Sequence, residues 1–126
     1  MSLRTPLSKV RGLGSAKDGT EHFWHQRVTA IANIPLILGF ALVLVNAVGK
    51  SHAEVAALLG SPFVVILLLL MIVSITWHMR LGMQVIIEDY VSSEGRKIAA
   101  LLLNNLFCIT MAVAGGYAIL KLGFAT

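Results

Sequence analysis

The sequence has little charge and almost no cysteine. Of its 126 residues, 13% are charged and 57% are hydrophobic, whereas about a quarter of the residues of a soluble domain are charged. Cys108 is the only cysteine and lies within an apolar run, which excludes an internal disulfide and a metal site built on paired thiols. These shortages indicate that water is not the main solvent of this chain.

The sequence also lacks the patterns of nucleic-acid binding. Its net charge is +4, but the basic residues flank apolar blocks, and neither a zinc-finger spacing nor an RNA-type aromatic motif is present. We therefore expect no nucleic-acid partner and attribute the positive excess to membrane topology.

The apolar residues are gathered in three blocks. Val28 to Gly49 and Ile98 to Leu120 contain 22 and 23 residues without a formal charge, and each is long enough to cross a bilayer core at about 1.5 Å per residue. The middle block is uncharged from Ser61 to Met79, and its helical pattern continues through Arg80 to Ile87. The sequence predicts an all-α membrane protein with a single domain over residues 1–126, consisting of a tail (1–27) and three transmembrane helices (about 28–49, 61–87 and 98–120).

Two connections separate these blocks, and the cations are distributed unevenly over them. Lys50 to Gly60 is predicted to be a short polar turn, and Glu88 to Lys97 another. Of the ten Lys and Arg residues, only Lys50 and Lys121 fall on one side of the predicted membrane. The other eight lie in the N-terminal tail, in the second connection or at the adjoining helix ends: Arg4, Lys9, Arg11, Lys17, Arg27, Arg80, Arg96 and Lys97. By the positive-inside rule the N-terminus lies inside and the C-terminus outside. We expect a multi-pass protein of the bacterial inner (plasma) membrane, and the mitochondrial inner membrane is the less favoured location.

His78 is an ionisable ring near the end of an apolar span, and such a residue needs a partner. On a helix with about 100° per residue, Ser74, Gly82 and Asp89 lie on the same face as His78. The small residues one turn on either side leave room for a flat macrocycle, and a neutral imidazole is a good ligand for haem iron. From spacing alone the alternative is a histidine that bonds to a neighbouring helix, with Gly82 permitting close packing.

The run from His78 to Val91, HMRLGMQVIIEDYV, resembles the second membrane helix of the succinate dehydrogenase hydrophobic membrane anchor subunit, the smaller of two anchors in bacterial succinate:quinone oxidoreductase. The family pattern is a haem-ligating His, a Gly four residues later, and Asp-Tyr eleven and twelve residues after the His, which correspond here to His78, Gly82, Asp89 and Tyr90. Arg27-Val-Thr-Ala-Ile resembles the start of that family's first helix. The length and the three spans agree as well, so the resemblance covers nearly the whole chain.

This resemblance implies a role for each matching residue. His78 would be an axial ligand of haem b, Asp89 and Tyr90 would border the ubiquinone site, and Arg27 would neutralise haem propionates or line the quinone pocket. The chain would be the membrane anchor of succinate:ubiquinone oxidoreductase, respiratory complex II, which links the tricarboxylic acid cycle to the respiratory chain. It would not be catalytic alone.

The same resemblance implies three kinds of protein partner. A second membrane anchor would supply the other haem ligand, and an iron–sulfur subunit and a flavoprotein subunit would carry the iron–sulfur clusters and FAD. This chain has no dinucleotide fingerprint and no multi-cysteine cluster of its own.

Other interpretations of individual residues stay open. Tyr90 is also typical of an aromatic belt, Asp89 of a turn cap and Arg27 of the positive-inside bias. His22 and His25 belong to an interfacial aromatic run, with a propionate contact as the alternative. Arg80 departs from the family pattern, and either extends to the inner headgroups or meets a propionate.

Three other functions compete with this hypothesis. The anchor of a fumarate-reducing relative would share the architecture, and a haem-free structural membrane adaptor would bind no pigment. A transporter would need a carboxylate near the membrane midplane, but the acidic residues of this sequence all lie outside the apolar blocks.

Overall fold

The computed structural model describes residues 5–11 and 18–124, with backbone only at residues 8, 9, 18 and 19. Within these residues the regular structure is entirely helical: α1 (Pro6–Val10), α2 (Asp18–Ala47), α3 (His52–Gly60), α4 (Pro62–Tyr90) and α5 (Glu94–Phe124). Two cations used in the topology prediction, Arg4 and Lys17, lie outside the described residues.

Three of the helices are long and apolar enough to cross a membrane. The candidate spans are Thr20–Ala47, Pro62–Tyr90 and Glu94–Phe124, with 28, 29 and 31 residues. The prediction of an all-α protein with three spans is confirmed. Helix α2, which contains the first span, begins at Asp18, ten residues before the predicted start. Hydropathy marks only the lipid-facing part of a helix, and α2 continues beyond that part through polar residues into the interface.

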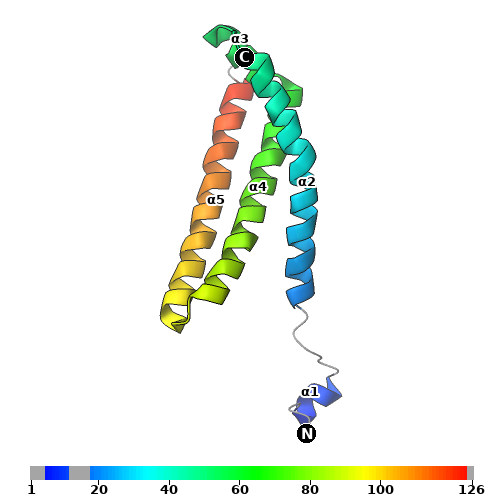
Figure 1. Ribbon diagram of the computed structural model, residues 1–126, viewed down its shortest axis with the longest axis vertical. Coiled ribbons are helices and arrows are strands. Elements are labelled where there is room, and N and C mark those ends of the chain that lie inside the picture. The colour runs from blue at the N-terminus through cyan, green and yellow to red at the C-terminus, as the bar shows by residue number, and fades with distance from the viewer. Residues whose placement is uncertain (1–4, 12–17, 125–126) are drawn as a thin grey trace.

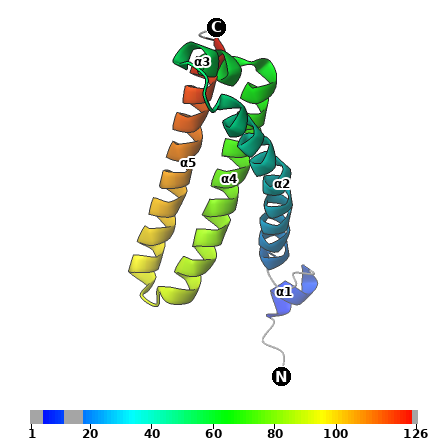
Figure 2. The ribbon, with the colours of Figure 1, turned by 45° about the horizontal axis from the view of Figure 1, so that its top comes forward.

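The predicted turn between the first two spans is wrong, because most of it is helix α3. Ser51 caps this helix: its backbone N donates to Glu54 Oε2 at 2.8 Å, and its Oγ accepts from Glu54 N at 3.4 Å. This reciprocal pair is a capping box. Gly49, with φ of 77°, turns the chain between α2 and α3. Figure 2 shows that α3 lies across one end of the bundle, near the C-terminus.

Helix α4 lies between α2 and α5 and packs against both (Figure 1). Glycines on the outer helices allow this packing. A Cβ added to Gly39 of α2 would lie 3.1 Å from Leu67, and one added to Gly115 of α5 would lie 2.8 Å from Ile72 Cγ1. Small residues commonly bring membrane helices this close, because little else draws apolar helices together in lipid.

The apolar core lies toward the α3 end of the bundle. Val43, Val64 and Leu68 are buried there, and partly buried residues of α3 and α5 pack against them. On other faces of α2 and α5 large apolar side chains are exposed, for example Leu42, Val45, Leu103 and Val113. In a membrane protein such faces contact lipid or another subunit.

Candidate functional site

His78 joins α4 to α2. Its Nδ1 lies 3.0 Å from Oγ1 of Thr29 on α2, and both side chains are partly buried. His78 stands twelve residues before the last residue of α4, which places it about 18 Å from that end along the helix axis. The imidazole is therefore inside the predicted span and is held through Nδ1, so Nε2 is the nitrogen that Thr29 leaves free.

An apolar groove lies between α2 and α4 and is lined by Thr29, though not by His78. It encloses about 590 Å³, and its lining includes His25, Thr29, Leu70, Ser74 and Trp77. The rings of His25 and Trp77 meet edge to face with centroids 6.0 Å apart, which joins the two helices a second time. A mainly apolar groove with a few polar groups is typical of a site for a small organic ligand or cofactor.

Helix α2 presents a polar stripe to α4. His22, Gln26, Thr29 and Asn33 fall within about 60° of one another around the helix. The atoms His22 Nε2, Gln26 Oε1, Asn33 Oδ1 and, on α4, Ser74 Oγ are buried and have no hydrogen-bond partner. Buried polar atoms are rarely left unpaired, so four of them along one helix pair favour a bound group or a further subunit here. The i, i+4, i+7, i+11 spacing of the stripe is visible in the sequence, but our sequence analysis missed it.

The surroundings of Gly82 are less open than the sequence analysis predicts. A Cβ built on Gly82 would meet Gln26 Nε2 at 3.4 Å, which is an ordinary contact. The amide of Gln26 therefore bounds the space that the sequence analysis left for a macrocycle.

The structure does not bring the other predicted site residues to His78. Asp89 and Tyr90 are the last residues of α4 and are exposed, Tyr90 to 84%. Arg27 is exposed, and its guanidinium lies 4.8 Å from the centroid of the Phe23 ring. It is two residues, about 200°, from Thr29 around α2 and therefore faces away from His78. A second subunit would have to cover these groups to form a closed site.

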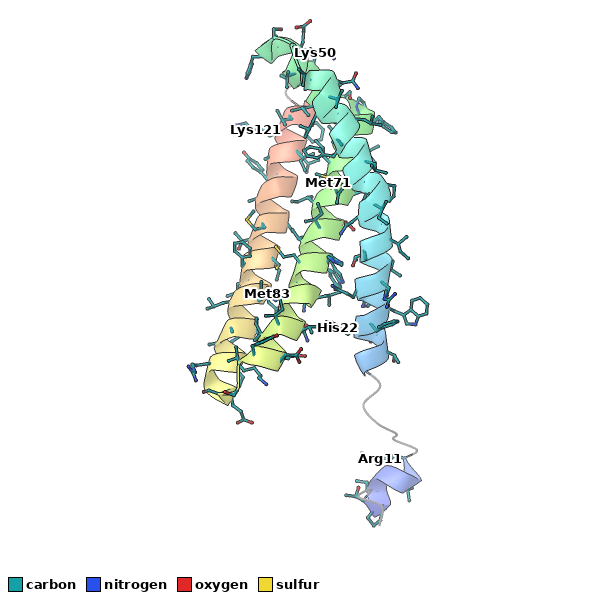
Figure 3. The ribbon with its side chains drawn as sticks, in the orientation of Figure 1. Arg11, His22, Lys50, Met71, Met83 and Lys121 are labelled. Carbon is teal, nitrogen blue, oxygen red and sulfur yellow. The ribbon has the colours of Figure 1, made fainter. Side chains whose placement is uncertain are left out.

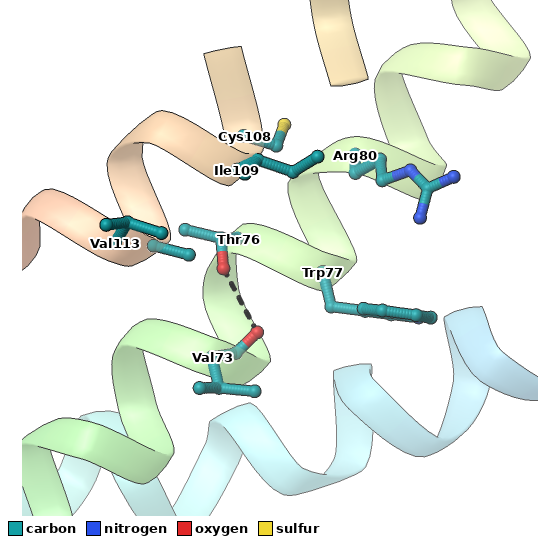
Figure 4. A pocket seen from close by; sticks show the side chains of 8 residues that line it. Val73, Thr76, Trp77, Arg80, Cys108, Ile109 and Val113 are labelled. Carbon is teal, nitrogen blue, oxygen red and sulfur yellow. Dashed lines mark hydrogen bonds between the residues drawn. The ribbon is translucent and has the colours of Figure 1, made fainter. Parts of the chain in front are cut away.

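Arg80 has partners on α5 that the sequence analysis did not consider. Its Nε donates to Asn105 Oδ1 at 2.6 Å, and Asn104 Nδ2 donates to its backbone carbonyl at 3.0 Å. The guanidinium also lies 5.5 Å from the centroid of the Trp77 ring. Figure 4 shows Arg80, Trp77 and Cys108 around a smaller cavity of about 200 Å³. Arg80 and His78 thus contact different helices, α5 and α2, from opposite sides of α4, as their separation of about 200° around the helix predicts.

The residues present fit a haem better than a metal ion held by protein alone. In the described ranges, 5–11 and 18–124, no three His, Cys, Asp or Glu side chains gather closely enough to hold a metal ion. Haem iron needs only axial ligands from protein, and a histidine with one ring nitrogen left free by its partner could supply one of them.

Comparison with known proteins places this chain in a family. The model of the family described as "Succinate dehydrogenase/Fumarate reductase transmembrane subunit" matches residues 1–113. The chain belongs to this family. The resemblance drawn from the His78 and Arg27 motifs is thereby confirmed, and the chain is a multi-pass membrane subunit of a larger complex.

Individual relatives match this chain over most of their own length. The succinate dehydrogenase hydrophobic membrane anchor subunit of Paracoccus denitrificans is 33% identical over 94% of this chain and 92% of its own length. The subunit of the same name from Rickettsia conorii is 34% identical over 88% and 89%. The succinate dehydrogenase membrane anchor subunit of Reclinomonas americana is 35% identical over 74% and 80%. No solved structure matches this chain.

Proposed function

We propose that this chain is the smaller membrane anchor of a succinate:ubiquinone oxidoreductase, in which His78 ligates haem b and Asp89 and Tyr90 help to form the quinone-reduction site. The second anchor would supply the other haem ligand. FAD and iron–sulfur clusters would belong to the flavoprotein and iron–sulfur subunits.

The observation that carries this proposal is the setting of His78. A histidine that only joined two helices would need one nitrogen and a close-packed, satisfied surrounding. His78 instead bonds to Thr29, which lines a groove of about 590 Å³, and unpaired buried oxygens lie on both helices, Ser74 Oγ and Gln26 Oε1. A groove and unsatisfied polar atoms between the two helices that His78 joins favour a cofactor over simple packing.

Each residue would have a definite task at the haem. When bound, haem b supplies a one-electron redox centre inside the membrane. His78 would hold one face of the iron through Nε2. Arg27, which faces away from His78, offers a planar guanidinium that would meet a propionate or line the quinone pocket from the other side of α2. The other histidines, His22, His25 and His52, lie outside the predicted lipid-crossing segments, so we expect the opposite ligand to come from another subunit.

The quinone site would lie at the end of α4. The phenol of Tyr90 can donate a hydrogen bond to a quinone carbonyl, and the carboxylate of Asp89 beside it can pass on protons that the reduced quinone takes up. Both side chains are exposed at the end of α4, where partner subunits would close the pocket.

The proposed orientation has the N-terminus and the α4–α5 connection inside. In Figure 3, Lys50 and Lys121 lie toward one end of the bundle, whereas Arg11 lies beyond the other. Arg27, Arg96 and Lys97 are near that second end, since they stand near the start of α2 and at the start of α5. This asymmetry supports the positive-inside assignment, and the bacterial relatives favour the bacterial inner membrane as the location.

A fumarate-reducing complex is the second candidate, because the matching family includes both enzymes. The experiment that tests the proposal is to purify the chain with its associated subunits, identify them, and record a reduced-minus-oxidised spectrum. We expect flavin, iron–sulfur and second-anchor subunits with a low-spin b-type haem. A pigment-free membrane fraction without these subunits would support a structural adaptor instead.

A further inference from the structure

We propose that Thr29 is a positioning residue for His78: its hydroxyl holds the imidazole as the Nδ1–H tautomer and so leaves Nε2 unprotonated for the iron. This inference rests on the proposed haem ligation. It concerns which ring nitrogen carries the proton and what fixes the orientation of the ring.

The argument begins with the single proton of the Thr29 hydroxyl. Thr29 Oγ1 lies 2.7 Å from the His25 carbonyl oxygen and 3.2 Å from the Gln26 carbonyl oxygen. Both carbonyl oxygens can only accept, so the hydroxyl proton is directed to them. Oγ1 therefore presents a lone pair to His78 Nδ1 at 3.0 Å.

The tautomer of His78 follows from this arrangement. Because Nδ1 faces a lone pair, it must carry the proton and donate to Thr29. A neutral imidazole has one N–H, so Nε2 then has a free lone pair, as a metal ligand requires. With the opposite tautomer, the Thr29 hydroxyl would have to turn away from the His25 carbonyl and donate to Nδ1, losing the 2.7 Å bond to that carbonyl.

The position of the Thr29 hydroxyl is itself fixed. The bonds to carbonyls three and four residues earlier on α2 select a side-chain rotamer for this β-branched residue. The edge-to-face contact between His25 and Trp77 joins α2 to α4 one turn away. Two successive turns of α2 therefore contact α4, one through His25 and the next through Thr29.

A hydrogen bond donated by the second nitrogen of a ligating histidine also changes the redox potential of the metal. It raises the basicity of the ligand, and a more basic ligand favours ferric over ferrous iron. Removing the Thr29 hydroxyl should therefore raise the midpoint potential of the haem and loosen the imidazole orientation.

The test uses the purified complex with Thr29→Val, which keeps the shape but loses the hydroxyl, and with Thr29→Ser, which keeps the hydroxyl. Redox titration and electron paramagnetic resonance of the ferric haem are the readouts. We expect Thr29→Val to shift the midpoint potential upward and change the low-field g value, while Thr29→Ser stays near wild type. Thr76→Val is the matched control, because the Thr76 hydroxyl donates within α4, to Ile72 O at 2.6 Å and Val73 O at 3.2 Å; it should leave both readouts unchanged.

Several outcomes would overturn the inference. A wild-type potential and spectrum in Thr29→Val would show that the hydroxyl does not act on the ligand. Loss of haem in both Thr29 variants would assign a purely structural role to this position, whereas loss in Thr29→Val alone would support the hydroxyl. A wild-type complex without haem would refute the proposed function, which is a distinct result.

Discussion

His78 and Tyr90 lie on the same helix, but their environments differ in the way that their proposed tasks require. His78 is partly buried and bonded to a neighbouring helix, whereas Tyr90 is 84% exposed at the end of α4. A buried, oriented imidazole suits a permanent ligand. An exposed phenol suits a site that is completed by other subunits and that a quinone enters and leaves.

Replacement of Tyr90 by Phe separates the quinone site from the scaffold. The variant loses the phenolic donor, and removal of one hydrogen bond of about 1.4 kcal/mol corresponds to a roughly tenfold loss of rate. We expect succinate:quinone reductase activity to fall by about that factor while succinate oxidation with an artificial acceptor persists. Tyr117→Phe on α5, also exposed, is the control. Equal loss of both activities in Tyr90→Phe would indicate failed assembly instead.

Glu54 provides a pH-dependent test of the capping box. The hydrogen bonds from the Ser51 side chain and backbone, with a smaller contribution from the charge of Lys50, hold the pKa of Glu54 below its ordinary value of about 4.5. The stabilisation of α3 by this carboxylate is therefore present above the ordinary pKa and is lost as the pH falls through the lowered folded-state pKa.

The measurement is a carboxyl NMR titration of Glu54. We expect Ser51→Ala to raise the Glu54 pKa toward its ordinary value and Ser92→Ala, in the other connection, to leave it unchanged. An unperturbed Glu54 pKa in the wild-type protein would contradict the capping assignment.

At the scale of elements, the sequence predicts the three spans well because each must cover a bilayer with apolar residues. Helix α3 was predicted to be a turn, although Ser51-His-Ala-Glu54 before an apolar run is a capping-box pattern that can be recognised in a sequence. His78 was recognisable as a candidate from its place in an apolar span, and Tyr90 through the family resemblance. The Thr29 contact was not, since it depends on which face of α2 meets α4.

Gly115 is the closest glycine contact between α4 and α5. A Cβ at this position would lie 2.8 Å from Ile72 Cγ1, whereas one on the adjacent Gly116 would meet nothing within 4 Å. We expect Gly115→Val to destabilise the helix pair by about 1–3 kcal/mol through overpacking. Thermal unfolding in detergent should show a lower midpoint for Gly115→Val than for Gly116→Val. Equal midpoints would contradict the packing of α5 on α4.

At the scale of the whole molecule, the bundle is incomplete by itself. Large apolar side chains cover the outer faces of α2 and α5, and the predicted quinone residues are open to solvent. The second anchor and the soluble subunits would cover part of this surface, and lipid the rest. The sequence could not predict which faces remain open, because that depends on the order α2–α4–α5.

The orientation of the bundle can be tested with single cysteines in a Cys108→Ser background. His52 lies in α3 and Ser92 in the α4–α5 connection, and both are exposed. In right-side-out vesicles we expect an impermeant thiol reagent to label His52→Cys and not Ser92→Cys. In inside-out vesicles stripped of soluble subunits the result should reverse. Labelling of Ser92→Cys from outside would contradict the proposed topology.

The most direct measurement of the central claim is the reduced-minus-oxidised spectrum of the purified complex carrying His78→Ala. If His78 ligates haem b, the b-type band of the wild type is lost or converted to a high-spin form. The control His52→Ala, an exposed histidine at the opposite end of the bundle, retains the wild-type band. A full wild-type band in His78→Ala would contradict the claim.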